Sequence, residues 1–276
     1  MSLSAVLFLF LAHLGVGIVF TLVFVSKDAG VKFFRFNAGL AAVLVAIALA
    51  FRYGALGSVQ ASHSDTDRLA LLALDVSEAA LVLYWATVGR VLARIRPAIV
   101  AASVAGGLFA IVLQALDVSA GWALPLRALT VASFLTSAAM LGGACTAMIL
   151  GHWYLVIPSL QVSHLQSIVR VHIGSMIARV AVVGAAVWFA LATSFAADPV
   201  LGPTFRRYIM SVDGIFFWQR VLFGLAGPAV LSYLTWETAK IRSTQSATGI
   251  LYVDFFTVVV GEVLAKYIVL ASHVPV

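Results

Sequence analysis

The sequence predicts an all-α, polytopic integral membrane protein, with about eight transmembrane helices in a single transmembrane domain over residues 1–276. Hydrophobic residues make up 63% of the chain and charged residues 10%, whereas a soluble domain carries about 25% charged residues. The mean hydropathy is +1.08. Apolar runs of about 20 residues recur along the chain, and this length suits a transmembrane helix better than the strand of a barrel.

Eight apolar runs separated by polar or basic loops are the expected spans. The first run lacks the basic residues that precede the apolar core of a signal peptide, so we expect it to be retained as a span. Eight spans of this kind can form two four-helix bundles. The spans are expected at about residues 3–25, 36–51, 69–89, 98–116, 128–150, 165–195, 214–238 and 249–272, with errors of a few residues at each boundary.

The segment HWYLVIPS, residues 152–159, follows the fifth span and is expected at the membrane interface. Trp153 and Tyr154 are typical of the aromatic belt at the headgroup level. Pro158 disfavours a continuing helix because it has no backbone N–H to donate. The fifth span is therefore expected to end before this segment.

Basic residues concentrate in every second loop, which predicts the orientation of the chain. The first, third and seventh loops carry eight: Lys27, Lys32, Arg35, Arg90, Arg94, Arg96, Lys240 and Arg242. The even-numbered loops carry five: Arg52, Arg68, Arg127, Arg206 and Arg207. The positive-inside rule then places the odd-numbered loops in the cytoplasm, so we expect a protein of the inner (cytoplasmic) membrane with both termini outside the cytoplasm. Basic residues in short loops do not form a nucleic-acid-binding stripe, so no nucleic-acid partner is expected.

Four ionisable side chains are expected at similar depth in the outer half of the membrane: His13, Asp75, Glu78 and Arg220. Counted along the helices, His13 lies roughly 15 Å inward, Asp75 and Arg220 roughly 9 Å, and Glu78 roughly 14 Å. Intramembrane charges usually face a bundle interior, a cofactor or a water path. An apolar slot with a hydrogen-bond donor, an acceptor and a proton-accepting histidine suits a quinone headgroup. We therefore expect these four residues to bind quinone.

Proton transfer is assigned to Glu262, Asp254 and Arg179. Glu262 lies in the outer half of the last span and Arg179 near the middle of the sixth, whereas Asp254 belongs to the cytoplasmic half. Lys266 follows Glu262 by four residues, so these two side chains could instead simply pair along the helix.

Three histidines in the cytoplasmic half, His152, His164 and His172, leave a haem b site open as an alternative. Bis-histidine ligation requires two histidines at matching depth on facing helices. His152 and His172 could meet this requirement, with His164 as the reserve ligand. The chain has one cysteine, so it holds no Cys-ligated iron–sulfur cluster and no internal disulfide.

The last two spans resemble those of the NrfD-like membrane anchors, the quinone-reactive subunits of dimethyl sulfoxide and polysulfide reductase complexes. The matching features are Arg220 at the start of the seventh span and Pro228 in its apolar run. The segment GEVLAK in the last span adds Gly261, Glu262 and Lys266.

The resemblance implies about eight spans, no haem, and a quinone site that includes a histidine on the first span, for which His13 is the counterpart. It also implies electron exchange between quinone (menaquinone or ubiquinone) and an iron–sulfur or cytochrome subunit docked on one face. The expected partners are therefore membrane lipid and these redox subunits of a larger complex, so that the chain alone is not expected to turn over.

Two further readings use the same residues differently. A proton-coupled transporter could employ the carboxylates Asp75, Glu78, Asp254 and Glu262, although transporters often show inverted repeats and broken helices that are not evident here. A purely structural anchor would only hold catalytic partners at the membrane, and the number of intramembrane charges argues against that reading.

Overall fold

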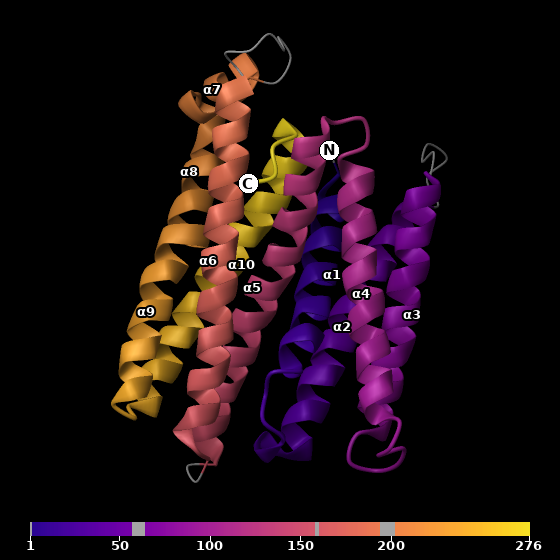
Figure 1. The fold of residues 1–276 in the computed structure, drawn as a ribbon, viewed down its shortest axis with the longest axis vertical. Helices are drawn as coiled ribbons and strands as arrows, with labels where there is room; N and C mark the ends of the chain where they lie inside the picture. The colour runs from indigo at the N-terminus through magenta and orange to yellow at the C-terminus, as the bar shows by residue number, and fades with distance from the viewer. Residues whose placement is uncertain (1, 57–63, 158–159, 194–201) are drawn as a thin grey trace.

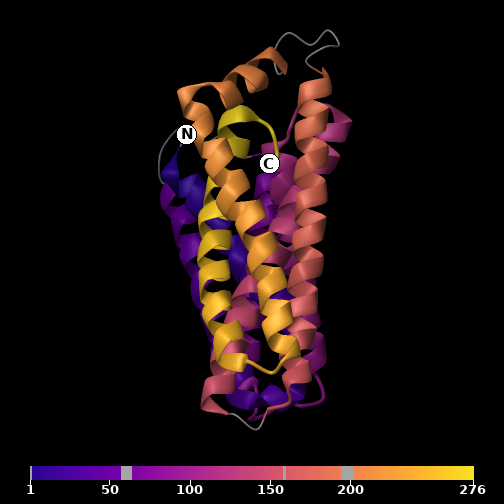
Figure 2. The same ribbon diagram turned by 90° about the vertical axis from the view of Figure 1, so that its left-hand side faces the viewer.

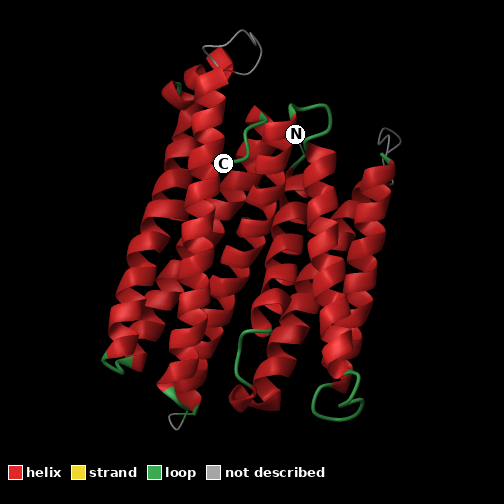
Figure 3. Ribbon diagram, viewed as in Figure 1, coloured by secondary structure: helices red, strands yellow, loops and turns green. Residues whose placement is uncertain are grey.

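The computed structural model describes residues 2–56, 64–157, 160–193 and 202–276, and every regular element in these ranges is helical (Figures 1 and 3). Eight helical segments are long and apolar enough to cross a membrane. The predicted all-α, multi-pass membrane fold is thereby confirmed. The long helices are α1 (Leu3–Leu22), α2 (Gly30–Leu56), α3 (Asp65–Thr87), α4 (Arg96–Val118), α5 (Leu124–Val156), α6 (Val162–Thr193) and α10 (Thr244–Ser272). The seventh segment along the chain consists of α8 (Ile215–Val221) and α9 (Gly227–Lys240), which are joined by a single π-helical turn, Leu222–Ala226.

The helices form two four-helix bundles that lie side by side (Figure 1). The first bundle contains α1 to α4, and the second contains α5, α6, α8–α9 and α10. Helices α1 and α5 form most of the junction between them. A Cβ atom on Gly17 of α1 would lie 2.0 Å from the carbonyl oxygen of Ala138, and one on Gly142 of α5 would lie 2.0 Å from Gly17. The two helices therefore touch backbone to backbone, as small residues allow between membrane helices.

Both termini lie at one end of the molecule, together with the α4–α5 turn and the short helix α7 (Gly202–Met210) (Figures 1 and 2). The α1–α2, α3–α4 and α9–α10 connections lie at the other end. Successive connections therefore alternate between the two ends, as eight membrane crossings require. The more basic loops all lie at the end opposite the termini. Which end faces the cytoplasm remains a prediction from the loop charges.

Several helices extend beyond their predicted spans, and three differences from the predicted elements affect the architecture. Helix α2 begins at Gly30, six residues before the predicted start, because Gly30 adopts a φ of 82° that ends the preceding 3-10 turn, Lys27–Ala29. Helix α5 continues to Val156, so most of the segment expected at the interface is helical. The Tyr154 hydroxyl holds this end of α5 to the start of α6, because it donates to the Gln161 carbonyl and accepts from the Leu165 N–H at 3.2 Å. Pro158 lies outside the described residues.

The third difference is helix α7, which lies between the sixth and seventh predicted spans. This short helix carries Arg206 and Arg207 on an exposed side, while Phe205 is buried. Phe205 packs edge-on against Phe217 of α8, with ring centroids 5.9 Å apart. A short amphipathic helix has no long apolar run, so hydropathy alone does not reveal it.

Candidate functional site

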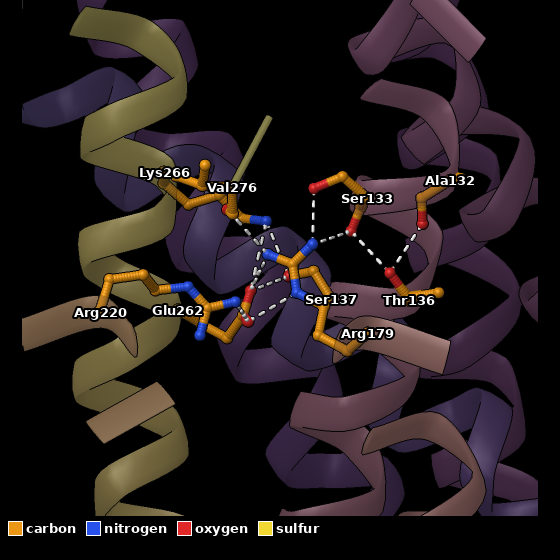
Figure 4. Close-up of polar contacts among 9 residues, drawn as sticks. All are labelled: Ala132, Ser133, Thr136, Ser137, Arg179, Arg220, Glu262, Lys266 and Val276. Atoms are coloured by element: carbon orange, nitrogen blue, oxygen red, sulfur yellow. Dashed lines mark hydrogen bonds and ion pairs between the residues drawn. The ribbon is translucent and has the colours of Figure 1, made fainter. Parts of the chain in front are cut away.

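A fully buried ion cluster surrounds the Glu262 carboxylate on α10 (Figure 4). Arg179 of α6 approaches it with Nε 3.0 Å from Oε1 and Nη2 3.1 Å from Oε2. Arg220 of α8 donates from Nη2 to Oε1 at 2.8 Å. The hydroxyl of Ser137 on α5 donates to Oε2 at 2.5 Å. Lys266, one turn further along α10, places Nζ 3.8 Å from Oε2. Every helical segment of the second bundle therefore contributes to one site.

Helix α5 completes the cluster with two serines spaced by one turn. Ser137 accepts a hydrogen bond from Lys266 Nζ at 2.7 Å. Ser133 accepts from Arg179 Nη1 twice, at its hydroxyl (2.5 Å) and at its carbonyl oxygen (2.9 Å). The carbonyl oxygen of Val276, which turns back into the bundle after α10, lies 3.3 Å from Arg179 Nη2. These contacts fix the orientation of the Arg179 guanidinium.

The sequence places Arg220 beside Glu262 through a pair of glycines. A Cβ atom on Gly261 would lie 2.1 Å from Gly224 Cα, and one on Gly224 would lie 1.9 Å from Arg220 Nη1. Gly224 lies in the π-helical turn. Pro228, four residues later, has no backbone N–H and cannot donate the helical hydrogen bond to the Gly224 carbonyl. Single π-helical turns within helices are frequent at functional sites. The interruption lets α8 and α10 approach closely, and the guanidinium occupies the space that a side chain would take.

The side chains of the cluster are unbalanced in formal charge. Three of them are basic, Arg179, Arg220 and Lys266, and one is acidic, Glu262. Across the part of the chain that the structure describes, no second acidic side chain pairs with these cations. Uncompensated buried charge is costly in a low-dielectric interior. The site is therefore suited to a ligand that carries or develops negative charge.

His13 of α1 lies at the junction of the two bundles and is fully buried. Its ring packs edge-on against Phe134 of α5, with centroids 4.9 Å apart. The same Phe134 ring has Lys266 Nζ 4.8 Å from its centroid. Phe134 therefore links His13 to the ion cluster.

The polar atoms around His13 are poorly satisfied. Within the described residues, neither ring nitrogen of His13 makes a hydrogen bond of good geometry, and its one polar neighbour there is the Gln114 side chain on α4, whose amide atoms make none either. Nε and Nη1 of Arg220 are also without one. An unsatisfied buried polar group costs about 1–3 kcal/mol. Buried donors without a partner can form hydrogen bonds to the polar group of a bound ligand.

The structure divides the four residues predicted to bind quinone between two places. His13 and Arg220 lie beside the ion cluster, as described above. Asp75, in contrast, accepts a hydrogen bond at 2.5 Å from the hydroxyl of Tyr53 on α2. Glu78 lies half-buried on the same helix, α3. These two carboxylates belong to the α2–α3 pair in the first bundle, and none of their described contacts reaches His13 or Arg220.

The residues assigned to proton transfer are similarly divided. Glu262 and Arg179 form the ion cluster. Asp254 lies eight residues earlier on α10, roughly 12 Å along the helix axis. It pairs with His172 of α6, with 2.8 Å between Nε2 and Oδ2 and both side chains fully buried. The contact lacks hydrogen-bond geometry, and the ring of His172 rests against Gly143 of α5.

The three histidines of the haem alternative have three separate partners. His172 pairs with Asp254. His152 is exposed on α5 and contacts the Tyr252 hydroxyl at 3.0 Å. His164 contacts the Asp28 carboxylate at 3.3 Å. Each of these contacts uses one ring nitrogen, and none of the described contacts joins two of the three histidines.

Four residues of this region were not predicted from the sequence: Ser133, Ser137, Phe134 and Gln114. The serines are spaced i, i+4 on an otherwise apolar span, which places them on one helix face. Gln114 interrupts the apolar run of the fourth span. These signals are weak, since serine is common in membrane helices, and nothing in the sequence pairs Phe134 with His13.

Comparison with known proteins identifies no relative: no protein-family model matches the chain, and no curated protein matches it. The resemblance to the NrfD-like anchors therefore remains a prediction.

Proposed function

We propose that this multi-pass membrane protein is the quinone-reactive subunit of a respiratory oxidoreductase complex in the cytoplasmic membrane, with both termini outside the cytoplasm. It would exchange electrons between quinone or quinol and a partner iron–sulfur or cytochrome subunit. One observation carries the proposal: the fully buried His13, whose ring nitrogens make no hydrogen bond of good geometry among the described residues, lies beside a cluster that has two more basic than acidic side chains.

The residues around His13 fit a quinone headgroup. Its two carbonyl oxygens are hydrogen-bond acceptors, and the unpaired N–H groups of His13, Gln114 and Arg220 are donors. Phe134 offers an aromatic face, and the surrounding helices are apolar. When bound, a quinone supplies the redox chemistry by taking up or releasing two electrons and two protons.

The polar residues of the site then have distinct roles. His13 is the proton donor and acceptor, because a neutral imidazole has one nitrogen of each kind and neither is occupied here. Arg179, Arg220 and Lys266 favour negative charge in their surroundings. Glu262 has its oxygens occupied by Arg179, Arg220 and Ser137, so we assign it the positioning of these cations. Asp254 and His172 form a second buried pair that can hold a proton, deeper toward the basic end.

Binding is tested on the purified protein in lipid nanodiscs prepared without quinone. Titration with short-tail ubiquinone and menaquinone analogues should show saturable binding. Arg220→Lys should weaken it about 10-fold or more, since a hydrogen bond to a charged group contributes about 1.5–3 kcal/mol, and His13→Ala should weaken it about 5-fold, since a hydrogen bond between neutral groups contributes about 1 kcal/mol. His164→Ala removes a histidine at the opposite end and is the matched control. Absence of saturable binding in the wild type, or equal affinities in all three variants, would contradict the site.

Electron exchange is tested in membranes that contain the partner subunits. Quinol-dependent turnover should fall in His13→Ala and remain in His164→Ala, while both variants assemble. Binding without any effect on turnover would show that the chain holds quinone but does not react with it.

A proton-coupled transporter is the second candidate, and the buried His172–Asp254 pair favours it. Proton or solute flux in liposomes that contain this chain alone, lost in Asp254→Asn, would support that function over the redox one.

A further inference from the structure

A groove separates α6 and α9 on the outer surface of the second bundle, away from the Glu262 cluster. It has a volume of about 380 Å³. Ile177 and Tyr233 on its sides are 64% and 61% exposed. Because both residues lie within membrane-spanning segments, the groove opens toward the lipid. Its lining residues are Arg170, Ile173, Met176, Ile177, Ala229, Ser232, Tyr233 and Trp236.

The groove has a polar end and an apolar end. Arg170 and Trp236 lie toward the end of the bundle where α6 begins and α9 finishes. Arg170 is roughly 12 Å along α6 from its start, and Trp236 is roughly 6 Å from the end of α9. Ala229, at the other limit, lies roughly 16 Å from that end. The groove thus runs from headgroup depth into the hydrocarbon. A bound lipid spans this range of depths, whereas a water-soluble ligand does not.

The polar end carries uncommitted positive charge. Arg170 donates only to its own helix, to the Gln166 carbonyl at 3.4 Å and the Ser167 hydroxyl at 3.3 Å. Its guanidinium lies 6.0 Å from the Trp236 ring centroid. Among the described residues no carboxylate pairs with it. Lys240 lies over the same ring at 5.5 Å and pairs with Glu237.

A second polar group lies deeper in the groove. Ser232 is one turn from Trp236 and 2% exposed. Its hydroxyl has no hydrogen-bond partner among the described residues. Serine hydroxyls in membrane helices can usually bond to the carbonyl one turn earlier, as Thr235 does here. A buried hydroxyl left free within a groove is suited to an acceptor on a ligand.

We propose that this groove binds one phospholipid with an anionic headgroup. Its phosphate contacts Arg170, an ester carbonyl oxygen accepts from the Ser232 hydroxyl, and one acyl chain lies between Ile173, Ile177 and Tyr233. Basic pockets between membrane helices recognise anionic headgroups in this way. The order of the groups matches the lipid, because the ester linkage lies deeper in the bilayer than the phosphate.

The test uses the full chain, purified in detergent, exchanged into nanodiscs of equal phosphatidylglycerol and phosphatidylcholine, and examined by native mass spectrometry. The wild type should retain one phosphatidylglycerol in preference to phosphatidylcholine. Arg170→Gln should lower that preference about 5-fold, the loss expected for one basic side chain. Arg90→Gln removes an exposed arginine at the same end of the other bundle and is the matched control.

Two further variants separate the parts of the site. Ala229→Phe fills the apolar end and should reduce retention of both lipids. Ser232→Ala should lower retention of both lipids without changing the preference between them. Equal retention of the two lipids by the wild type, or equal losses in Arg170→Gln and Arg90→Gln, would overturn the proposal. Displacement of the retained lipid by a long-tail quinone at equal concentration would also overturn it, because the groove would then be a quinone-tail site.

Discussion

Arg220 on α8 and Glu262 on α10 form an ion pair of 2.8 Å with no exposure to solvent, and the pair exists because two glycines bring its helices together. Gly224 and Gly261 leave no room for a Cβ atom between them. Each glycine lies close in sequence to one member of the pair. The close approach and the buried charges are therefore one structural unit, and a change in either should disturb the other.

Gly261→Ala should separate α8 from α10 and weaken the ion pair. The added Cβ atom would lie 2.1 Å from Gly224 Cα, and this contact is with backbone, which cannot rotate away. We expect a loss of about 2 kcal/mol or more in the free energy of unfolding, within the range for overpacking, measured by denaturant titration in detergent. Gly249→Ala on the same helix meets nothing within 4 Å and should be neutral or slightly stabilising. Equal effects of the two substitutions would contradict the close approach.

Glu262→Ala should destabilise the protein strongly. It leaves Arg179, Arg220 and Lys266 buried without their carboxylate. Breaking a buried ion pair from one side costs about 3–5 kcal/mol. The control is Glu237→Ala, which removes the exposed pair with Lys240 and should cost about 1 kcal/mol at most. Thermal melting of both variants in the same detergent compares them, and similar melting temperatures would refute a structural role for the cluster.

Gly17→Ala should disturb the junction between the bundles and, through it, the position of His13. A Cβ atom there would lie 2.0 Å from the Ala138 carbonyl oxygen, so α1 must move away from α5. His13, one turn earlier on the same helix, would then lose its contact with Phe134. We expect quinone affinity to fall at least 3-fold in nanodiscs, because the donors are no longer in place. A Cβ atom on Gly174 would have no neighbour within 4 Å, so the Gly174→Ala variant should bind quinone as the wild type does. Unchanged quinone affinity in Gly17→Ala would show that the packing of α1 on α5 does not determine the quinone site.

Hydropathy was sufficient to predict the all-α, multi-pass fold, whereas only part of the candidate site could be predicted from the sequence. Counting residues along each span gives the depth of a side chain, and depth alone suggested that His13, Arg220 and Glu262 share a layer. Depth also places Asp75 in this layer, yet in the structure its carboxylate faces Tyr53 on the neighbouring helix α2 and not the Glu262 cluster. Depth is one coordinate; the direction in which a helix faces depends on how the helices pack, and a single sequence does not contain that information.

The smaller features were missed for local reasons. The π-helical turn at Leu222–Ala226 is signalled only by Pro228, and proline in a membrane helix can equally produce a kink. Ser133 is identified as a site residue by the hydrogen bond that it accepts from Arg179, which the sequence does not reveal.

His172 and Asp254 should behave as one coupled unit. Each is fully buried, and the contact of 2.8 Å joins α6 to α10. Asp254→Leu alone leaves the imidazole without its partner and should cost about 1–3 kcal/mol. His172→Leu alone leaves a carboxylate in the membrane interior and should cost about 3–5 kcal/mol. The double variant replaces both polar groups with apolar ones and should recover much of that loss, because apolar replacement of a buried pair is often close to neutral. Denaturant titration of the four proteins gives the coupling free energy, which should exceed about 1 kcal/mol. Additive losses would show that the two side chains are stabilised independently, by their own surroundings and not by each other.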